Sequence, residues 1–296
     1  MKIVYLSCFL LILYLADATA AVYKYKNDSG KWVFTDKKPV EVSSEIIEFK
    51  QKKRISFKPR FYIKESDGKY NLIVENKFYA PIQLKIIIGE ERLSITQLVA
   101  PKEIIILAAL HSKNEKYRYR WVLGDPDSTI LSNEYHVPVS KVGKYKVSQG
   151  FNGKFSHSTE PNKHAIDIAL PIGTNLIAAR AGTVISVKDD YHMGGKDKYF
   201  FDKANHVKIL HEDGTYALYA HILIGSAEVK LGDKVVVGQK IARSGSSGYS
   251  TGPHLHFVIK KNVGMKTISL PFYLVDAKGR KIHPRKGVIL NVPRKT

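Results

Sequence analysis

Short apolar segments rich in β-branched residues, separated by glycine and proline turns, run through most of this chain and constrain its fold. Between Tyr62 and Val137 they include YNLIVENKFYAPIQLKIIIG and EIIILAAL. The same pattern of short apolar segments and turns continues from Gly143 onward, with turn signals such as Asp213-Gly214. Such runs are typical of strands, and the periodicity of helices is nearly absent. The sequence therefore predicts a mainly β fold, in which a small sandwich-like β domain over residues 62–142 precedes a second β domain.

The N-terminal segment MKIVYLSCFLLILYLADATA has the organisation of a secretory signal peptide. Lys2 precedes an apolar run over 4–16, and an Ala-Thr-Ala site ends at Ala20. We expect a signal peptide over 1–20 and a periplasmic or secreted protein with no integral membrane span after cleavage; an uncleaved anchor is the alternative. Cys8 is the only cysteine and lies in this segment. The mature chain would therefore bind a metal through histidine and carboxylate side chains.

The charge balance is strongly basic, with 47 Lys and Arg against 27 Asp and Glu, a formal net charge of +20. Such a surplus attracts anionic partners, and export makes nucleic acid an unlikely one. We therefore expect no nucleic-acid partner and predict contact with an anionic cell wall or membrane surface through basic segments. These are a linker over 48–61, which follows a short N-terminal β motif over 21–47, and a C-terminal extension over 264–296. Simple solvation of the charges is the alternative.

Chemistry-bearing residues concentrate in the second half, where nine of the eleven histidines lie. Asp167 stands in HAIDIALP among apolar residues, a costly place for a carboxylate unless something pairs with it. A metal ion would supply that pairing. In the segment H-L-H, the two-residue period of a strand puts His254 and His256 on one face and turns Leu255 into the core.

The same parity argument bears on the remaining histidines. It places His164 on the face opposite Asp167, which favours His157, in the preceding loop, as a partner of the carboxylate; His164 is the alternative. His221 ends the strand TYALYAH, on the face of Tyr219. Two further histidines, His206 and His211, are expected at the surface or along a groove.

Four segments in this region resemble the lysostaphin-like (LytM-type) zinc metallopeptidases of bacterial cell walls. They are QGFNGKFSH, HAIDIALPIGTNLIAARAGTV, ANHVKILHEDGTYALYAH and LGDKVVVGQKIARSGSSGYSTGPHLHF. The resemblance covers residues 143–263 and implies an antiparallel β-sheet groove domain of the duplicated hybrid motif-like type. It also implies one zinc ion per chain. One departure is Lys163, which stands where many family members have the first histidine of H-x-x-x-D. The implied ligands are His157, Asp167 and His256, and the implied catalytic residues are His221 and His254.

The resemblance also implies a reaction. The expected activity is hydrolysis of peptide cross-links in peptidoglycan, of the DD-endopeptidase type, with the peptide stems as substrate. The alternative is a catalytically silent regulator of this fold that activates another cell wall hydrolase. The glycine-rich loop 245–252 is expected to let a peptide approach closely along the groove wall.

Overall fold

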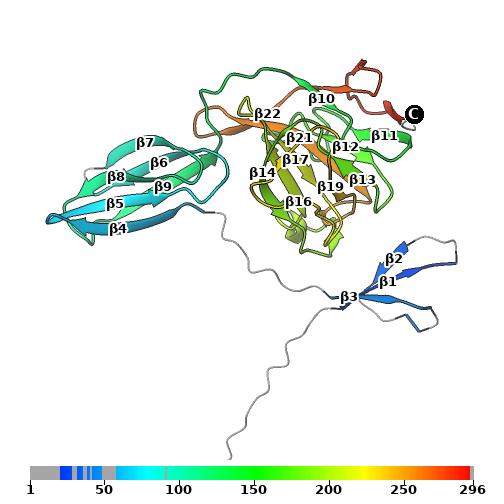
Figure 1. Ribbon diagram of the computed structural model, residues 1–296, viewed down its shortest axis with the longest axis horizontal. Coiled ribbons are helices and arrows are strands. Elements are labelled where there is room, and N and C mark those ends of the chain that lie inside the picture. The colour runs from blue at the N-terminus through cyan, green and yellow to red at the C-terminus, as the bar shows by residue number, and fades with distance from the viewer. Residues whose placement is uncertain are drawn as a thin grey trace, which may run out of the picture. The chain divides into compact units, whose positions relative to one another are not determined.

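The protein is almost entirely β, as the sequence predicts (Figure 1). The computed structural model describes residues 21–28, 32–35, 39–40, 42–48, 58–90 and 92–293. Within these ranges the helical structure is one short 3-10 turn, η1, at Lys198–Phe200. No helix in the described part of the chain is long and apolar enough to cross a membrane. The expected signal peptide, with Cys8, and most of the expected basic linker lie outside the described residues.

The N-terminal unit, residues 1–53, contains a small antiparallel sheet with the strand order β2-β1-β3. The sequence predicts a short β motif here, and the structure shows three strands, of which β2 and β3 both pair with β1. The bounds are β1 at Ala21–Lys26, β2 at Trp32–Thr35 and β3 at Glu45–Glu48.

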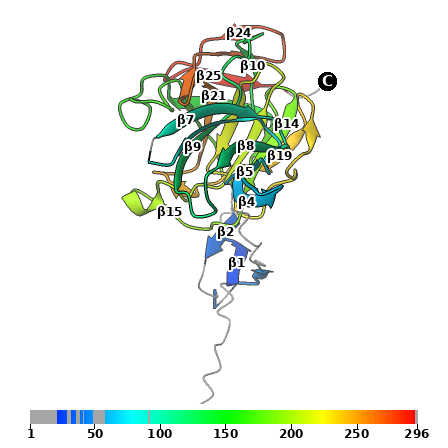
Figure 2. The ribbon, with the colours of Figure 1, turned by 90° about the vertical axis from the view of Figure 1, so that its left-hand side faces the viewer.

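Residues 60–123 form two three-stranded antiparallel sheets (Figures 1 and 2). The first has the order β4-β5-β8 and the second β7-β6-β9. Their bounds are β4 Arg60–Ser66, β5 Lys69–Glu75, β6 Ile82–Ile88, β7 Leu93–Val99, β8 Ile104–Leu110 and β9 Tyr117–Leu123. Buried side chains of both sheets, such as Val74 and Leu84, share one apolar cluster. The pair is therefore a sandwich, and it begins two residues before the position expected from the sequence.

The rest of the described chain is built around a nine-stranded sheet. Its order is β18-β14-β16-β17-β21-β12-β11-β25, with β22 also paired to β21. The bounds are β11 Gly143–Gln149, β12 Ile166–Ala169, β14 Gly182–Lys188, β16 His206–Leu210, β17 Tyr216–Ala220, β18 Lys234–Val235, β21 His254–Asn262, β22 Thr267–Leu270 and β25 Ile289–Val292. All of its pairings are antiparallel.

Three smaller strand groups accompany this sheet. One has the order β10-β23-β24, and the others are the pairs β13–β19 and β15–β20. Their bounds are β10 Glu134–His136, β13 Asn175–Ile177, β15 Gly194–Gly195, β19 Lys240–Arg243, β20 Gly248–Tyr249, β23 Tyr273–Val275 and β24 Lys281–Ile282.

The alternation of side chains along the strands separates the two faces of the nine-stranded sheet. Ile168 and Leu255, which are directly paired on β12 and β21, are fully buried in the core. That core also contains Leu176 of β13 and Ile241 of β19, so the β13–β19 pair packs against this face. The opposite face carries the polar residues between these positions, including Asp167.

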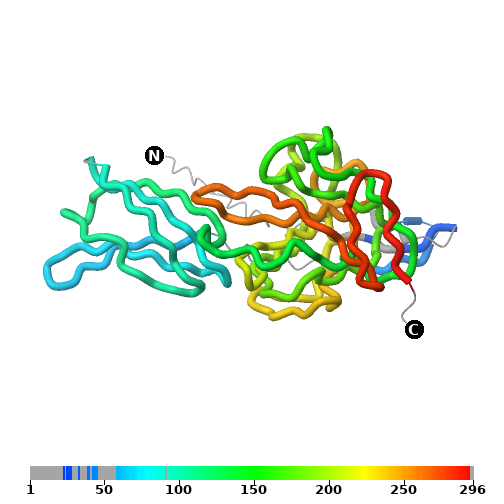
Figure 3. Tube along the Cα trace, turned by 90° about the horizontal axis from the view of Figure 1, so that it is seen from above, coloured from blue at the N-terminus to red at the C-terminus, as the bar shows by residue number. Residues whose placement is uncertain are grey.

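The segment 264–296, expected as a basic extension, contributes strands to the domain it was expected to follow. β22 pairs with β21, and β25 pairs with β11. In Figure 3 the orange and red C-terminal segment lies along the green strands of the same domain. Leu290 of β25 is fully buried. The basic side chains of this segment are therefore carried by strands whose apolar residues complete the core.

Candidate metal centre

The strand register aligns one row of residues across five strands of the nine-stranded sheet. His206 pairs with Ala220, Ala220 with His256, His256 with Asp167, and Asp167 with Gln149. Directly paired residues of neighbouring strands project from the same face. The row therefore brings side chains from distant parts of the sequence together on the face opposite the core, with the small Ala220 beside His256.

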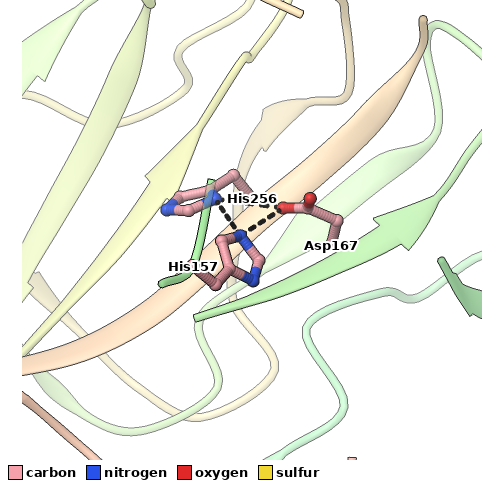
Figure 4. A group of neighbouring side chains, drawn as sticks. All are labelled: His157, Asp167 and His256. Atoms are coloured by element: carbon pink, nitrogen blue, oxygen red, sulfur yellow. Dashed lines mark hydrogen bonds and ion pairs between the residues drawn. The ribbon is translucent and has the colours of Figure 1, made fainter. Parts of the chain in front are cut away.

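Asp167 and two histidines converge at the centre of this row (Figure 4). Asp167 Oδ1 lies 3.0 Å from Nδ1 of His256 and 3.2 Å from Nε2 of His157. The two histidine nitrogens are 3.3 Å apart. His157 comes from the loop after β11 and is fully buried, and Asp167 and His256 are each 8% exposed. The structure thus gathers the three residues that the sequence suggested as ligands.

Neighbouring groups hold these side chains in place. His157 Nδ1 donates to the carbonyl of Gly150 at 3.1 Å, which leaves Nε2 for the centre. Gln149 Nε2 donates to Asp167 Oδ2 at 3.0 Å. Burial would raise the pKa of Asp167, but its close contacts with the His157 and His256 rings outweigh burial and lower the pKa well below 3.8. The carboxyl group is therefore ionised. Hydrogen bonds of this kind orient metal ligands and tune their basicity.

The three donor atoms suit a zinc ion. They all lie within 4.8 Å of one another, and their separations of 3.0, 3.2 and 3.3 Å are near the ~3.3 Å expected between N and O ligands of a tetrahedral zinc. Catalytic zinc sites use three protein ligands of this kind and keep a fourth position open. The donor set of two imidazoles and one carboxylate therefore fits a catalytic metal centre.

His221 reaches the same face by a route that strand parity does not predict. β17 ends at Ala220, and Tyr219 is fully buried in the core, so a regular strand would turn His221 toward the core as well. Instead, His221 has a left-handed backbone with φ 64°. Its ring centroid lies 4.5 Å from that of His254. The expectation that His221 shares the face of Tyr219 is thus wrong, because the backbone reverses the direction of the side chain.

Main-chain carbonyls fix the tautomers of His221 and His254. Nδ1 of His221 donates to the carbonyl of Ser247 at 2.6 Å, and Nδ1 of His254 donates to that of Gly252 at 2.8 Å. When either ring is neutral, its Nε2 therefore carries no proton. Burial lowers the pKa of His221 to about 3, with smaller contributions from the charges of His254 and His256. Nε2 of His254 lies 3.7 Å from Asp167 Oδ1. Two imidazoles that can accept protons thus stand beside the candidate centre.

Half of the residues in the loop 245–252 are buried, namely Gly245, Ser247, Gly248 and Ser250. Its main chain supplies the carbonyls that orient the two histidines, as described above. A Cβ on Gly245 would lie 2.7 Å from Leu223 N, and one on Gly248, which has φ 76°, would lie 2.5 Å from Ala204 N. The glycines at these two positions are required by the close approach of neighbouring main chain. The loop therefore packs against the site and supports it, and at Gly245 and Gly248 the absence of a side chain serves this packing rather than the approach of a peptide.

The other histidines singled out in the sequence lie outside the His–Asp–His group. His164 Nδ1 lies 3.0 Å from the carbonyl oxygen of Ser269, whereas His157 belongs to the group. His211 is 2% exposed and donates from Nδ1 to the carbonyl of Ala181 at 2.8 Å. Burial lowers its pKa to about 4. His211 is therefore a core residue, contrary to expectation. His206 is half-buried on the polar face of the sheet.

A curled antiparallel sheet with a buried His–Asp–His group and two adjacent imidazoles has the features of a metal-dependent hydrolase domain. Comparison with known families makes this specific. Residues 161–267 match the family model described as Peptidase family M23, so this part of the chain is a peptidase M23 domain. The matched region contains Asp167, His221, His254 and His256, whereas His157 precedes it.

Similar proteins carry names consistent with this family. The chain is 34% identical over 131 residues to an uncharacterized metalloprotease of Buchnera aphidicola, covering 42% of this chain and 32% of that protein. It is 31% identical over 156 residues to the peptidoglycan DD-endopeptidase ShyA of Vibrio cholerae, covering 51% and 31%. It is 30% identical over 118 residues to the glycyl-glycine endopeptidase ALE-1 of Staphylococcus capitis, covering 40% and 30%. The chain thus spans about a third of the length of these relatives.

Solved structures include the catalytic domain of lysostaphin from Staphylococcus simulans. Its identity to this chain is 26% and the TM-score is 0.29, with 40% of this chain and 79% of that chain covered.

Proposed function

We propose that the protein is an exported zinc metalloendopeptidase that hydrolyses the peptide cross-links of peptidoglycan. The observation that supports it most is the convergence of three buried donor atoms with two imidazoles whose Nε2 atoms carry no proton in the neutral form. In this proposal His157, Asp167 and His256 hold one zinc ion per chain. When bound, zinc lowers the pKa of water and polarises the carbonyl of the scissile bond.

His221 and His254 would manage the protons of the reaction. One Nε2 accepts a proton from the attacking water, and the ring then carries a positive charge that the carbonyl of Ser247 or Gly252 stabilises through Nδ1. The N–H groups that face the site in the protonated rings would donate to the negatively charged oxygen that develops on the substrate. Either of the two histidines can serve as the base with this geometry.

The proposed substrate class follows from the similar proteins. ShyA is named for DD-endopeptidase activity on peptidoglycan and ALE-1 for glycyl-glycine bonds. We propose the DD-endopeptidase type for this chain, with peptide stems as substrate. The proposal includes the signal peptide over 1–20, a periplasmic or secreted location, and contact of the basic segments with the anionic wall. It also includes the division into an N-terminal β motif, a sandwich and a peptidase domain, the last now extended to Val292.

Digestion of purified peptidoglycan tests this function. The protein starting at Ala21 and its His256→Ala variant are incubated with the wall in the presence of zinc, and the released products are identified by mass. His164→Ala is the matched control, because His164 bonds to Ser269 outside the candidate centre. We expect cleaved cross-links from the wild type and the control, and none from His256→Ala. A zinc-loaded wild type that releases no product would refute the enzyme and favour the catalytically silent regulator of another hydrolase.

A further inference from the structure

Two lysines lie on the same face of the nine-stranded sheet as the candidate metal centre. Lys260 is on β21, four residues after His256, and both point away from the core face. Lys208 is on β16, opposite Leu218 of β17, and Lys260 is opposite Tyr216 of the same strand. At ~3.3 Å per residue, Lys260 stands ~13 Å along the strand from His256.

Both lysines are withdrawn from water and lack a close acidic partner. Lys260 is 8% exposed and Lys208 is half-buried. Within the part of the chain that the structure describes, neither makes a hydrogen bond through its ammonium group or an ion pair within 4.0 Å. Lys261, the next residue, shows the contrast. It is also buried, but its Nζ donates to the carbonyls of Pro126 at 2.8 Å and Asp125 at 3.3 Å.

The charges near Lys260 do not offset the cost of burying its ammonium group. Burial and, to a smaller extent, the positive charge of Lys208 lower the pKa of Lys260 to about 7, although the negative charge of Glu160 acts in the opposite direction. Oε2 of Glu160 is already engaged, because it accepts from the backbone N of Ser269 at 2.7 Å and from its Oγ at 2.8 Å. Burial also lowers the pKa of Lys208.

His206 lies on the side of the two lysines nearer the candidate metal centre, and the charges of the lysines act on it. Burial lowers its pKa to about 3, and the positive charges of Lys208, Lys188 and Lys260 act in the same direction. Its Nε2 accepts from Ser186 Oγ at 2.9 Å. Confining ammonium groups near one another and away from water is costly unless an anion pairs with them. An anionic ligand would remove that cost.

We propose that Lys208 and Lys260 form an anion subsite on the polar face of the sheet, which binds a carboxylate of the substrate peptide. This inference rests on the proposed endopeptidase function. An extended peptide advances ~3.3–3.6 Å per residue, so the carboxylate lies within about four residues of the bond that is hydrolysed. The pair selects acidic peptides by charge-assisted hydrogen bonds, whereas the metal centre acts on the peptide bond itself.

Binding of two matched peptides to the full chain tests the subsite independently of hydrolysis. The probes are a synthetic peptidoglycan stem tetrapeptide with free carboxylates and the same peptide with every carboxylate amidated, and binding is measured by calorimetry. Lys208→Met and Lys260→Met keep the length of the side chain and remove its charge, and the exposed Lys278→Met is the control. We expect each subsite variant to weaken binding of the free-carboxylate peptide by about 10-fold or more. Binding of the amidated peptide should not change in these variants, and Lys278→Met should bind both peptides as the wild type does.

The outcomes separate the subsite from the catalytic proposal. Equal binding of the two peptides by the wild type overturns the subsite and requires no variant to fold. Equal weakening of both peptides by the methionine variants, or no weakening, overturns it as well. Absence of cross-link hydrolysis together with selective, lysine-dependent binding of the free-carboxylate peptide would instead refute the enzyme and retain the carboxylate subsite.

Discussion

Replacing His157 by alanine should remove the metal without unfolding the domain. Nε2 of His157 lies 3.2 Å from Asp167 Oδ1 and 3.3 Å from His256 Nδ1, and it is one of three donor atoms at the candidate centre. Loss of a group that merely orients a ligand typically weakens metal affinity by about 10–100-fold. Loss of a donor atom should exceed that, so we expect the Kd for zinc to rise by at least about 100-fold.

His164→Ala provides the matched comparison. The His164 ring contacts Ser269 through Nδ1, at 3.0 Å from the carbonyl and 3.2 Å from Oγ. Its removal should cost about 1 kcal/mol of stability, the value of one hydrogen bond, and leave the zinc affinity within about twofold of the wild type. The two variants remove the same side chain from positions seven residues apart, so they differ in location and not in chemistry.

The assay is competition for zinc against a chelator of known affinity, with circular dichroism as the check on folding. The metal content of each purified variant gives a second, independent reading. The assignment of His157 fails if folded His157→Ala retains wild-type affinity. It also fails if His164→Ala is the variant that loses zinc, because His164 would then be the ligand in spite of its contact with Ser269.

Three further outcomes follow from the contacts described above. Gln149→Ala removes the hydrogen bond that orients the carboxylate of the centre, and chelator competition should show a 10–100-fold weaker zinc affinity. Asp213→Asn weakens an ion pair with Arg180, and urea unfolding at pH 7 should show a loss of about 3 kcal/mol. Burial would raise the Asp213 pKa, but hydrogen bonds from Thr215 and Arg180 outweigh it and lower the pKa; the loss should therefore shrink as the pH falls below 3.8. His221→Gly should be about 1–2 kcal/mol more stable than His221→Ala, because a backbone with φ 64° strains alanine but not glycine, while both lose hydrolysis.

Regular strands made part of the site predictable. In H-L-H and in HAIDIALP the two-residue period correctly placed Leu255 in the core. It also predicted that His254 and His256 share one face of their strand, and the register pairs these two residues with Ala169 and Asp167 of β12. A carboxylate among apolar residues was informative because burial without a partner is costly. These inferences needed only local alternation, which the sequence displays openly.

Features that depend on irregular backbone were not predictable in the same way. The direction of the His221 side chain depends on one left-handed residue, which strand parity cannot indicate. The position of His157 depends on how the loop after β11 folds back over the sheet. The buried glycines of the loop 245–252 are required because the main chain of Leu223 and Ala204, which is distant in sequence, approaches them closely.

Charge misled the prediction at the C-terminus. Many lysines and arginines between Met265 and Thr296 suggested a basic extension outside the second β domain. An edge strand, however, needs few apolar residues to join a sheet, and β25 pairs with β11 while Leu290 is buried and Val288 and Val292 pack against the core. The basic side chains are interspersed with apolar residues such as these, so the strands cannot be recognised from the average composition of the segment.

Because two of the candidate donors, Asp167 and His256, belong to a single row of residues across five strands, binding of a metal would depend on the correct register of those strands. Sliding β12 by one residue against β21 would turn Asp167 into the apolar layer and bring Ile168 out to face His256. The sheet could retain most of its backbone hydrogen bonds in that misaligned form, yet the three donors could not meet. A metal ion added during refolding would therefore bind and enrich only those molecules whose strands are correctly aligned.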